Sequence, residues 1–227
     1  MSLFLYPKTK HVRTQKPRVF KNYRSYKRYL QTEFSRICVY CRQPDSSAPN
    51  LNFGADHYRP KSVPRFAPML CDYNNLYYCC GTCNSRKSDY WPFDEKAGPF
   101  VVNPCEHEMA AHLRFNSSTG EIETRSPHGE HTEELLQLND PELIQYRRSA
   151  LTIARVLKAE IVETKEEFRI VESAYVAGKI TLTQRDRVIA EIQAELDSLM
   201  YTLHAQTGEL ALRPLKKQKL GISIIVP

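Results

Sequence analysis

Residues 74–91 read NNLYYCCGTCNSRKSDYW and place three cysteines beside asparagine, arginine and lysine side chains. The stretch CVYC at residues 38–41 adds two more cysteines, and ADHYRPKS at residues 55–62 adds an aspartate–histidine pair. Two C-x-x-C pairs result, and four thiolates are the ligand set of a closed tetrahedral zinc site. We therefore expect a structural zinc ion bound by Cys38, Cys41, Cys80 and Cys83.

The chain has seven cysteines, an odd number, and its first residues contain no apolar run long enough for a secretory signal. We therefore expect a cytoplasmic protein. In a reducing compartment, cysteines are metal ligands or buried thiols rather than disulfides. Cys71, Cys79 and Cys105 are more typical of buried thiols, although Cys79 could replace Cys80 in the zinc site with a spacing one residue longer.

The composition is that of a globular protein. The 227 residues include 41 % hydrophobic and 26 % charged residues. This length is sufficient for one medium domain with an appendage, or for two small domains. No apolar run approaches the roughly 20 residues that a membrane-spanning helix needs, so a membrane partner is not expected.

Positive charge is concentrated at the N-terminus, where nine lysines and arginines precede the first acidic residue, Glu33. Aromatic residues alternate with these cations, a composition suited to binding phosphates and stacking on bases. The alternative is that Tyr23, Tyr26 and Leu30 form the packed face of a helix, and both interpretations can hold together. The nucleic-acid contacts expected here are Arg18, Lys21, Arg24, Lys27 and Arg28.

The chain divides into three regions of different character. Residues 1–35 form a basic arm, extended up to residue 19, followed by a helix from about residue 20 to 36. Residues 36–138 form a small domain with a strand at 100–104 and a hairpin that turns at residues 117–120.

The third region, residues 139–227, is a helical hairpin with an apolar tail. The Asp140-Pro141 pair is a strong helix start, and the helical pattern continues to Gly178. A second helix runs from about Thr183 to His204 and stops at Gly208. The predicted fold class is α+β, a small zinc-stabilised domain with an antiparallel helical hairpin attached.

The order of motifs between residues 36 and 93 resembles the four-cysteine form of the HNH endonuclease family. The matching elements are C-x-x-C, Asp-His-x-x-Pro-Lys-Ser, Asn-Leu and C-x-x-C-Asn-x-x-Lys, with five residues from Asn75 to Cys80. Asn84 stands where many members have the last histidine. The resemblance implies a ββα-metal fold with His57 at the end of the first strand and a helix starting near Cys83.

The resemblance also implies hydrolysis of phosphodiester bonds, with DNA favoured over RNA as substrate. His57 is then the general base, Asp56 and Asn84 hold Mg²⁺ or Mn²⁺, and Asn75 hydrogen-bonds the loop that carries His57. These roles agree with physical need, because neutral imidazole can take a proton near pH 7 and hard cations prefer oxygen ligands. The implied phosphate contacts are Arg59, Lys61, Arg86 and Lys87.

Two alternative functions remain open at this point. The first is a zinc-stabilised nucleic-acid-binding module without catalysis, which would not need Asp56 and His57 together. The second is an effector subunit, cleaving DNA or RNA under the control of a partner such as an ATPase, in the manner of some bacterial anti-phage defence systems. The long hairpin and apolar tail also favour a homo-oligomer or a docked partner protein.

The remaining histidines receive no catalytic role. His107 and His112 lie near Glu106 and Glu108, but such groups are more typical of a solvated helix face than of a metal site. His128 and His131 lie in a segment with glycine and proline and are assigned no function.

Overall fold

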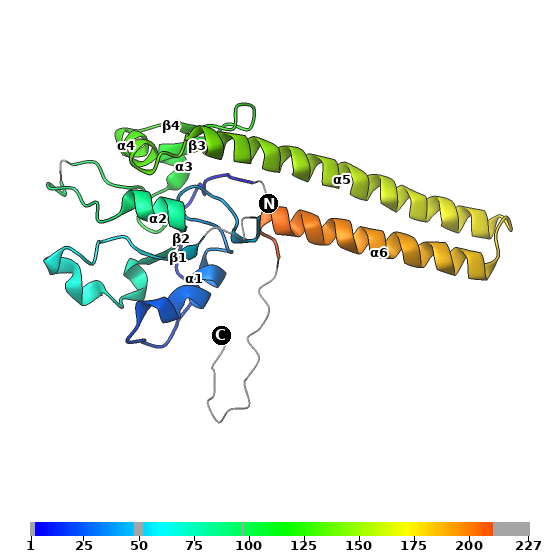
Figure 1. The fold of residues 1–227 in the computed structure, drawn as a ribbon, viewed down its shortest axis with the longest axis horizontal. Helices are drawn as coiled ribbons and strands as arrows, with labels where there is room; N and C mark the ends of the chain where they lie inside the picture. Colours follow the sequence, from blue (N-terminus) through cyan, green and yellow to red (C-terminus); the bar gives the residue numbers. More distant parts are fainter. Residues whose placement is uncertain (1–2, 48–51, 97, 211–227) are drawn as a thin grey trace, which may run out of the picture.

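The computed structural model describes residues 3–47, 52–96 and 98–210. It is a mixed α/β structure with two small antiparallel sheets and several helices. A body of short elements carries a long helical hairpin that projects from one side (Figure 1). The apolar run predicted at residues 222–226 lies outside the described residues.

A ββα unit forms the centre of the body. Strand β1 (Phe53–His57) pairs antiparallel with β2 (Leu76–Cys80), so that His57 lies opposite Leu76. Every residue of β2 is buried, because the sheet is covered on both faces. Helix α2 (Gly81–Lys87) follows β2 directly, as the resemblance implied.

The turn from β2 into α2 requires a glycine. A Cβ atom at Gly81 would lie 2.9 Å from the backbone oxygen of Asn52, closer than carbon and oxygen tolerate. Cys80 is the N-cap of α2, and its sulfur accepts a hydrogen bond from the backbone N–H of Cys83. The same short turn therefore starts the helix and brings two cysteines to one place.

The N-terminal helix is shorter than the sequence predicted. It consists of a 3₁₀ turn, η1 (Tyr23–Tyr26), and helix α1 (Lys27–Glu33), rather than one helix over residues 20–36. The Asn22 side chain caps η1 by accepting from the Arg24 N–H. After α1, Ser35 adopts a left-handed backbone conformation at φ 51°, which ends the helix.

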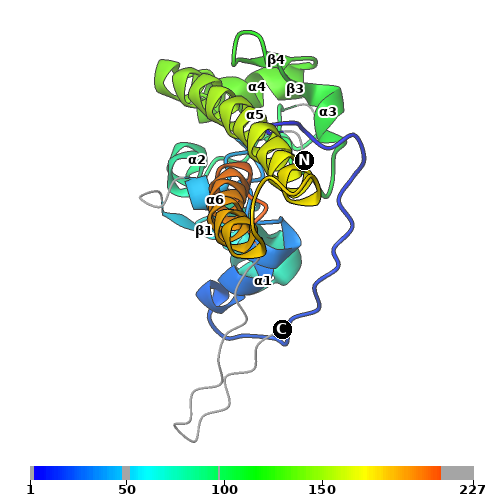
Figure 2. The same cartoon turned by 90° about the vertical axis from the view of Figure 1, so that its right-hand side faces the viewer.

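The segment before η1 is extended, as predicted, but it is anchored to the body. Figure 2 shows it (dark blue) running along one side of the body toward α1. The buried Glu33 carboxylate accepts hydrogen bonds from the backbone N–H groups of Thr14 and Gln15, and from the Tyr73 hydroxyl. These contacts hold the segment in place.

Residues near the start of the chain are part of the main core. Phe4 and Tyr6 are 3 % and 6 % exposed and pack in the same cluster as Leu30 and the cysteines. The boundary expected at residue 35 therefore does not separate two cores.

The region after the ββα unit differs in part from the prediction. Residues 100–104 form no strand; instead Val101 and Val102 are buried, and the Thr132 hydroxyl accepts a hydrogen bond from Val102 N. The predicted hairpin is confirmed as β3 (Leu113–Phe115) and β4 (Ile122–Thr124). Gly120 has φ 82° in its turn, a conformation that favours glycine.

Two helices in this region were not predicted, α3 (Met109–His112) and α4 (Pro127–Leu136). The start of α4 had a sequence signal, because Ser126 accepts from the Gly129 N–H and Pro127 occupies the first turn.

The helical hairpin agrees closely with the prediction. Helix α5 (Pro141–Val176) begins after the N-cap Asp140, and α6 (Leu182–Thr207) begins with a complete capping box at Thr181. Gly208 ends α6 at φ 78°. At 1.5 Å per residue, α5 is about 54 Å long. Among the described residues, no helix is long and apolar enough to cross a membrane.

Candidate functional site

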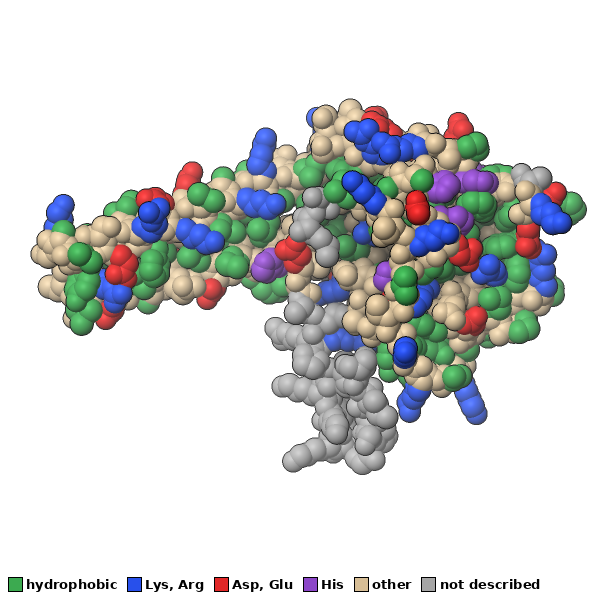
Figure 3. All heavy atoms as spheres, turned by 180° about the vertical axis from the view of Figure 1, so that it is seen from behind, with side chains coloured by type: hydrophobic (Ala, Val, Ile, Leu, Met, Phe, Trp, Pro, Cys, Tyr) green, Lys and Arg blue, Asp and Glu red, His purple; other side chains and the backbone are tan. Residues whose placement is uncertain are grey.

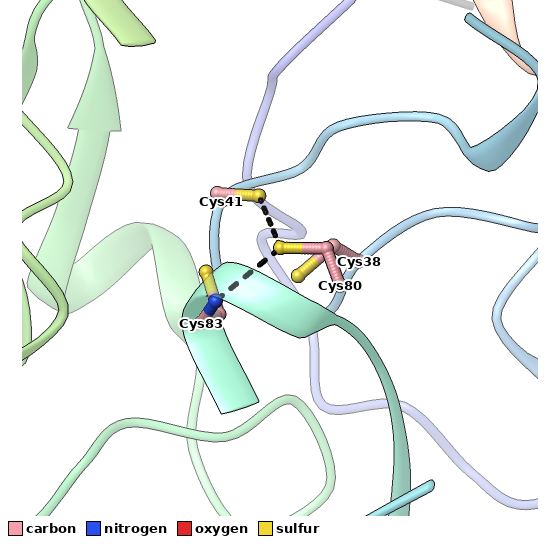
Figure 4. Close-up of side chains that lie close together, drawn as sticks. All are labelled: Cys38, Cys41, Cys80 and Cys83. Carbon is pink, nitrogen blue, oxygen red and sulfur yellow. Dashed lines mark hydrogen bonds between the residues drawn. The ribbon is translucent and has the colours of Figure 1, made fainter. Parts of the chain in front are cut away.

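The four cysteines of the two C-x-x-C pairs lie together beside the ββα unit. Their sulfur atoms all lie within 4.8 Å of one another, and all four side chains are buried (Figure 4). The Cys41 and Cys80 sulfurs are 3.7 Å apart, and a tetrahedron with Zn–S bonds of about 2.3 Å has edges of roughly 3.8 Å. The cluster could therefore hold a structural metal ion such as zinc.

The first pair lies on a tight turn after α1. The Cys38 N–H donates to the Gln43 carbonyl, and Arg42, at φ 63°, donates its N–H to the Cys38 carbonyl. Cys79 is outside the cluster, since its sulfur lies 3.1 Å from the Cys80 carbonyl oxygen. The group of sulfur atoms that could hold a metal ion consists of Cys38, Cys41, Cys80 and Cys83, without Cys79.

His57, at the end of β1, has a defined tautomer. Its Nε2 atom lies 2.9 Å from the Leu70 carbonyl oxygen, which can only accept a hydrogen bond. Nε2 therefore carries the proton, and Nδ1 of the neutral ring has the free lone pair. Burial is the largest effect on this group and lowers the pKa of His57, so the neutral form dominates near pH 7.

Asn75 closes the loop that leaves β1. Its Nδ2 donates to the Arg59 carbonyl at 3.0 Å, and its Oδ1 accepts from the Arg59 N–H at 2.8 Å. The Tyr58 N–H also donates to the Asn75 carbonyl. Asn75 is 1 % exposed, so its amide holds the backbone just after His57 and does not face solvent.

Asp56 has a partner on each carboxylate oxygen. The Tyr40 hydroxyl donates to Oδ2 at 2.6 Å, and the Lys87 ammonium lies 3.1 Å from Oδ1. Lys87 also donates to the His57 carbonyl at 2.8 Å. Both members of the ion pair are buried, at 2 % and 1 % side-chain exposure. The pair links α2 to the end of β1.

Two of the predicted phosphate contacts are structural instead. Lys87 is enclosed in the ion pair, and its ammonium group is not accessible to a phosphate. Arg86 donates to the carbonyls of Leu136 and Gln137, and pairs with Asp140 at 2.9 Å. Arg86 therefore ties α2 to the end of α4 and the start of α5.

A polar cavity of about 280 Å³ opens beside His57. Its polar lining includes Asp56, His57, Lys61, Ser62, Asn84 and Asp89.

The cavity brings both predicted oxygen donors to one place, Asp56 and Asn84. Asn84 is exposed on α2, and its amide makes no hydrogen bond to any described residue. Each Asp56 oxygen retains a second lone pair beside its present partner. These donors fit, in chemical type, a hard divalent cation that keeps most of its waters, although the positive charge of Lys87 opposes such a cation.

The other predicted cations differ in their surroundings. Arg59 pairs with Glu106 at 3.2 Å and lies over the Trp91 ring. Lys61 is exposed and lies 3.5 Å from the Tyr23 hydroxyl. Of the five contacts predicted in the basic arm, Arg18, Lys21, Arg24 and Lys27 are exposed, whereas Arg28 is half-buried.

Several contacts at the site could not be predicted from the sequence. Tyr40 lies between the first two cysteines, where its hydroxyl reaches Asp56, and Tyr23 comes from a segment outside the motif. The backbone carbonyl of Leu70 has no sequence signal at all. For Tyr23, the only sequence signal was general: aromatic residues alternate with cations in the basic arm.

The histidine group further along the chain is packed, not solvated. The rings of His107 and His128 stack on Phe100, with centroids 4.3 Å and 3.6 Å away. Figure 3 shows histidine side chains gathered on this face of the body. The Nδ1 atoms of His107 and His128 accept from the backbone N–H groups of Asn103 and Phe100. These histidines therefore serve to pack and hydrogen-bond the loop.

Comparisons with known proteins supply no relative from which a role could be inferred. No family model matches the chain, and no match was found among curated proteins or solved structures.

Proposed function

We propose that the chain is a metal-dependent nuclease of the HNH type that hydrolyses phosphodiester bonds of nucleic acid, with DNA favoured. The observation that carries the proposal is the hydrogen bond from His57 Nε2 to the Leu70 carbonyl, in a polar cavity of the ββα unit. This contact leaves Nδ1 free to act as a base, and a nucleic-acid-binding module without catalysis has no need of such a base.

In the proposed reaction, Nδ1 of His57 accepts a proton from the attacking water. The Leu70 carbonyl holds the ring and stabilises the imidazolium that forms, because that carbonyl continues to accept from Nε2. Asn75 fixes the loop after His57, and Lys87 fixes the end of β1 through the His57 carbonyl. The imidazole is thus positioned by backbone contacts on both sides.

Asp56 and Asn84 would hold Mg²⁺ or Mn²⁺, which supplies positive charge to stabilise the phosphate and the leaving oxygen. Since Lys87 already compensates Asp56, we expect the cation to bind weakly without substrate. Phosphate oxygens and waters would complete its coordination shell.

The main rival is a zinc-stabilised nucleic-acid-binding module without catalysis. It would use the same cysteines and the same basic surface. It gives no reason for a buried histidine with a fixed tautomer at the wall of a polar cavity. The two functions differ in one observable, the cutting of a bound strand.

The test is to incubate purified protein with plasmid DNA, single-stranded DNA and RNA, each with Mg²⁺, Mn²⁺ or EDTA. The proposal predicts cleavage of at least one substrate with added cation and none in EDTA. Binding of all three substrates without cleavage under any metal condition would support the rival. Full cleavage in EDTA would remove Asp56 and Asn84 from the role of cation ligands.

A further inference from the structure

Tyr23 forms one wall of the cavity although it lies outside the segment that carries the HNH-like motifs. Its ring meets the His57 ring edge-on, with centroids 4.6 Å apart and planes at 69°. It belongs to η1, which packs against β1. The N-terminal region therefore contributes a side chain to the candidate site.

The position of Tyr23 is well supported. Asn22 caps the turn that carries it, and Tyr26, at the end of the same turn, is 2 % exposed. The Tyr26 hydroxyl accepts from the Phe20 N–H at 2.9 Å. Tyr23 is thus placed by a short element that is fixed at both ends.

Two cations lie close to the Tyr23 ring. Lys61 Nζ is 3.5 Å from the hydroxyl oxygen and 5.1 Å from the ring centroid, and the Arg24 guanidinium is 5.9 Å from the centroid. Arg24 and then Lys61 lower the pKa of Tyr23. The hydroxyl accepts from Lys61, so its own proton remains available to an incoming acceptor.

Lys61 has no acidic partner among the residues that the structure describes. Arg59, two residues earlier, pairs with Glu106, whereas Lys61 donates its hydrogen bond to a neutral phenol. His57 cannot bind an anion through Nε2–H, because that group already donates to Leu70. The cavity wall beside His57 therefore offers donors from Tyr23 and Lys61, in addition to the Asn84 amide.

We propose that Tyr23 and Lys61 together bind a phosphate group of the nucleic-acid strand beside His57. This inference rests on the proposed nuclease function and adds a phosphate-binding pair that the N-terminal region completes. The ammonium supplies charge and the phenol supplies a directed hydrogen bond. The exposed cations Arg24, on η1, and Lys27, at the start of α1, extend the positive surface from this pair.

A purely structural role for Tyr23 gives different expectations. If the ring only packs on His57, then Tyr23→Phe keeps the contact and changes nothing. If the hydroxyl binds phosphate, the same substitution weakens substrate binding while the fold is kept. Lys61 is exposed, so Lys61→Met also leaves the fold intact.

The experiment measures binding of a fluorescent oligonucleotide in EDTA, across a range of salt concentrations. Lys61→Met should weaken binding about tenfold at low salt and reduce the salt slope by about one, as for the loss of one phosphate contact. Lys61→Arg should restore the slope. Tyr23→Phe should weaken binding about threefold to tenfold without changing the slope, because the phenol is uncharged.

Matched controls come from the same chain. Tyr29→Phe removes a hydroxyl on α1, and Lys179→Met removes an exposed cation in the turn that joins α5 to α6. Both controls should bind as wild type does. Melting curves and zinc content, measured on every variant, should be unchanged.

Cleavage assays with added cation separate the two claims. We expect KM to rise for Tyr23→Phe and Lys61→Met, with a smaller change in kcat. If wild-type protein neither binds nor cuts nucleic acid, the proposed function fails. If wild type binds and cuts while both variants match Tyr29→Phe and Lys179→Met, the nuclease function stands and the phosphate-binding pair is rejected.

Discussion

The ion pair between Asp56 and Lys87 connects the stability of the ββα unit to its chemistry. Lys87 reaches both the Asp56 carboxylate and the His57 carbonyl from α2. A buried pair of this kind contributes little compared with apolar packing, but the removal of one partner leaves a buried charge uncompensated. Lys87 therefore matters for the fold in a way that an exposed phosphate contact would not.

The first prediction concerns this pair. Lys87→Ala should lower the free energy of unfolding by about 3–5 kcal/mol, since Asp56 is left buried without its cation. Urea denaturation of the metal-loaded protein measures this change. Lys165→Ala, an exposed lysine of α5, should change the free energy by less than about 0.5 kcal/mol. A loss below about 1 kcal/mol for Lys87→Ala would mean that the pair does not hold α2 in place.

The second prediction concerns pH. Burial lowers the pKa of His57 below the ordinary value of about 6.5, and the neutral ring is the form that can act as base. The rate of cleavage should therefore be at its maximum above about pH 6.5. It should fall as the pH drops through the pKa of His57 in the folded protein. His57 also takes up a proton more readily in the unfolded chain, so its contribution to stability decreases over the same acidic range. An activity midpoint well above pH 7 would show that another group is the base.

For single residues, the sequence predicted which side chains lie at the site better than it predicted what those side chains contact. It brought Asp56, His57 and Asn84 together correctly, because neighbouring strands and a following helix leave few arrangements. It assigned Arg86 and Lys87 to a phosphate surface, whereas in the structure Lys87 is buried against Asp56 and Arg86 pairs with Asp140, contacts that depend on what α5 and β1 place around them. A lysine on a short helix looks the same in sequence whether it faces solvent or a buried carboxylate.

The elements of the ββα unit are short, and the cysteine cluster holds them. Strand β1 and helix α2 have five and seven residues. Such elements are marginal alone, and a metal ion bound by the four cysteines would compensate for their small size. The cluster joins the turn after α1 to the end of β2, so loss of metal should affect both.

The third prediction tests this dependence. Cys83→Ser should lose the metal and the folded structure together, because three thiolates bind zinc much more weakly than four. Zinc content and far-UV circular dichroism measure the two losses. Cys71→Ser is the matched control, since Cys71 lies outside the cluster and donates only to the Lys21 carbonyl. Retention of one zinc per chain by Cys83→Ser would contradict the four-cysteine site.

The elements with strong local signals were predicted well, and those set by long-range packing were not. Asp140-Pro141 and Gly208 mark the start of α5 and the end of α6 by cap chemistry alone. Residues 101 and 102 looked like a strand because they are β-branched and apolar. They are buried, but they pair with no strand among the described residues. Whether such a segment becomes a strand depends on the tertiary structure around it.

At the scale of the whole molecule, the extended N-terminal segment belongs to the body. Deletion of residues 1–19, the natural way to test its charges, would also remove buried Phe4 and Tyr6. Loss of one buried aromatic side chain from a core lowers the free energy of unfolding by about 3–5 kcal/mol. The charges are therefore better tested by single substitutions such as Arg18→Gln, which leave the core intact.

The hairpin extends well beyond the body and leaves apolar side chains exposed. Val162 and Ile170 on α5 are 66 % and 61 % exposed, and the hairpin has a core of its own around Ile161, Ile192 and Leu196. Exposed apolar side chains such as these are available for contact with a second chain. The expected homo-oligomer or partner protein remains a prediction.

The fourth prediction follows from this surface. Light scattering of the purified protein should give a mass above the 26.3 kDa of one chain, and Val162→Glu with Ile170→Glu should lower it. The zinc content should not change. A monomer before and after substitution, with no partner recovered from cells, would contradict the prediction.

The central claim is that His57 performs chemistry and the cysteine cluster holds the fold. The most direct test measures DNA cleavage, zinc content and melting temperature on the same samples of wild type, His57→Ala and His204→Ala. The account predicts that His57→Ala keeps one zinc and the wild-type melting curve but loses cleavage, while His204→Ala, on α6 and away from the cavity, keeps all three. Cleavage by His57→Ala at the wild-type rate, with the fold intact, would contradict it.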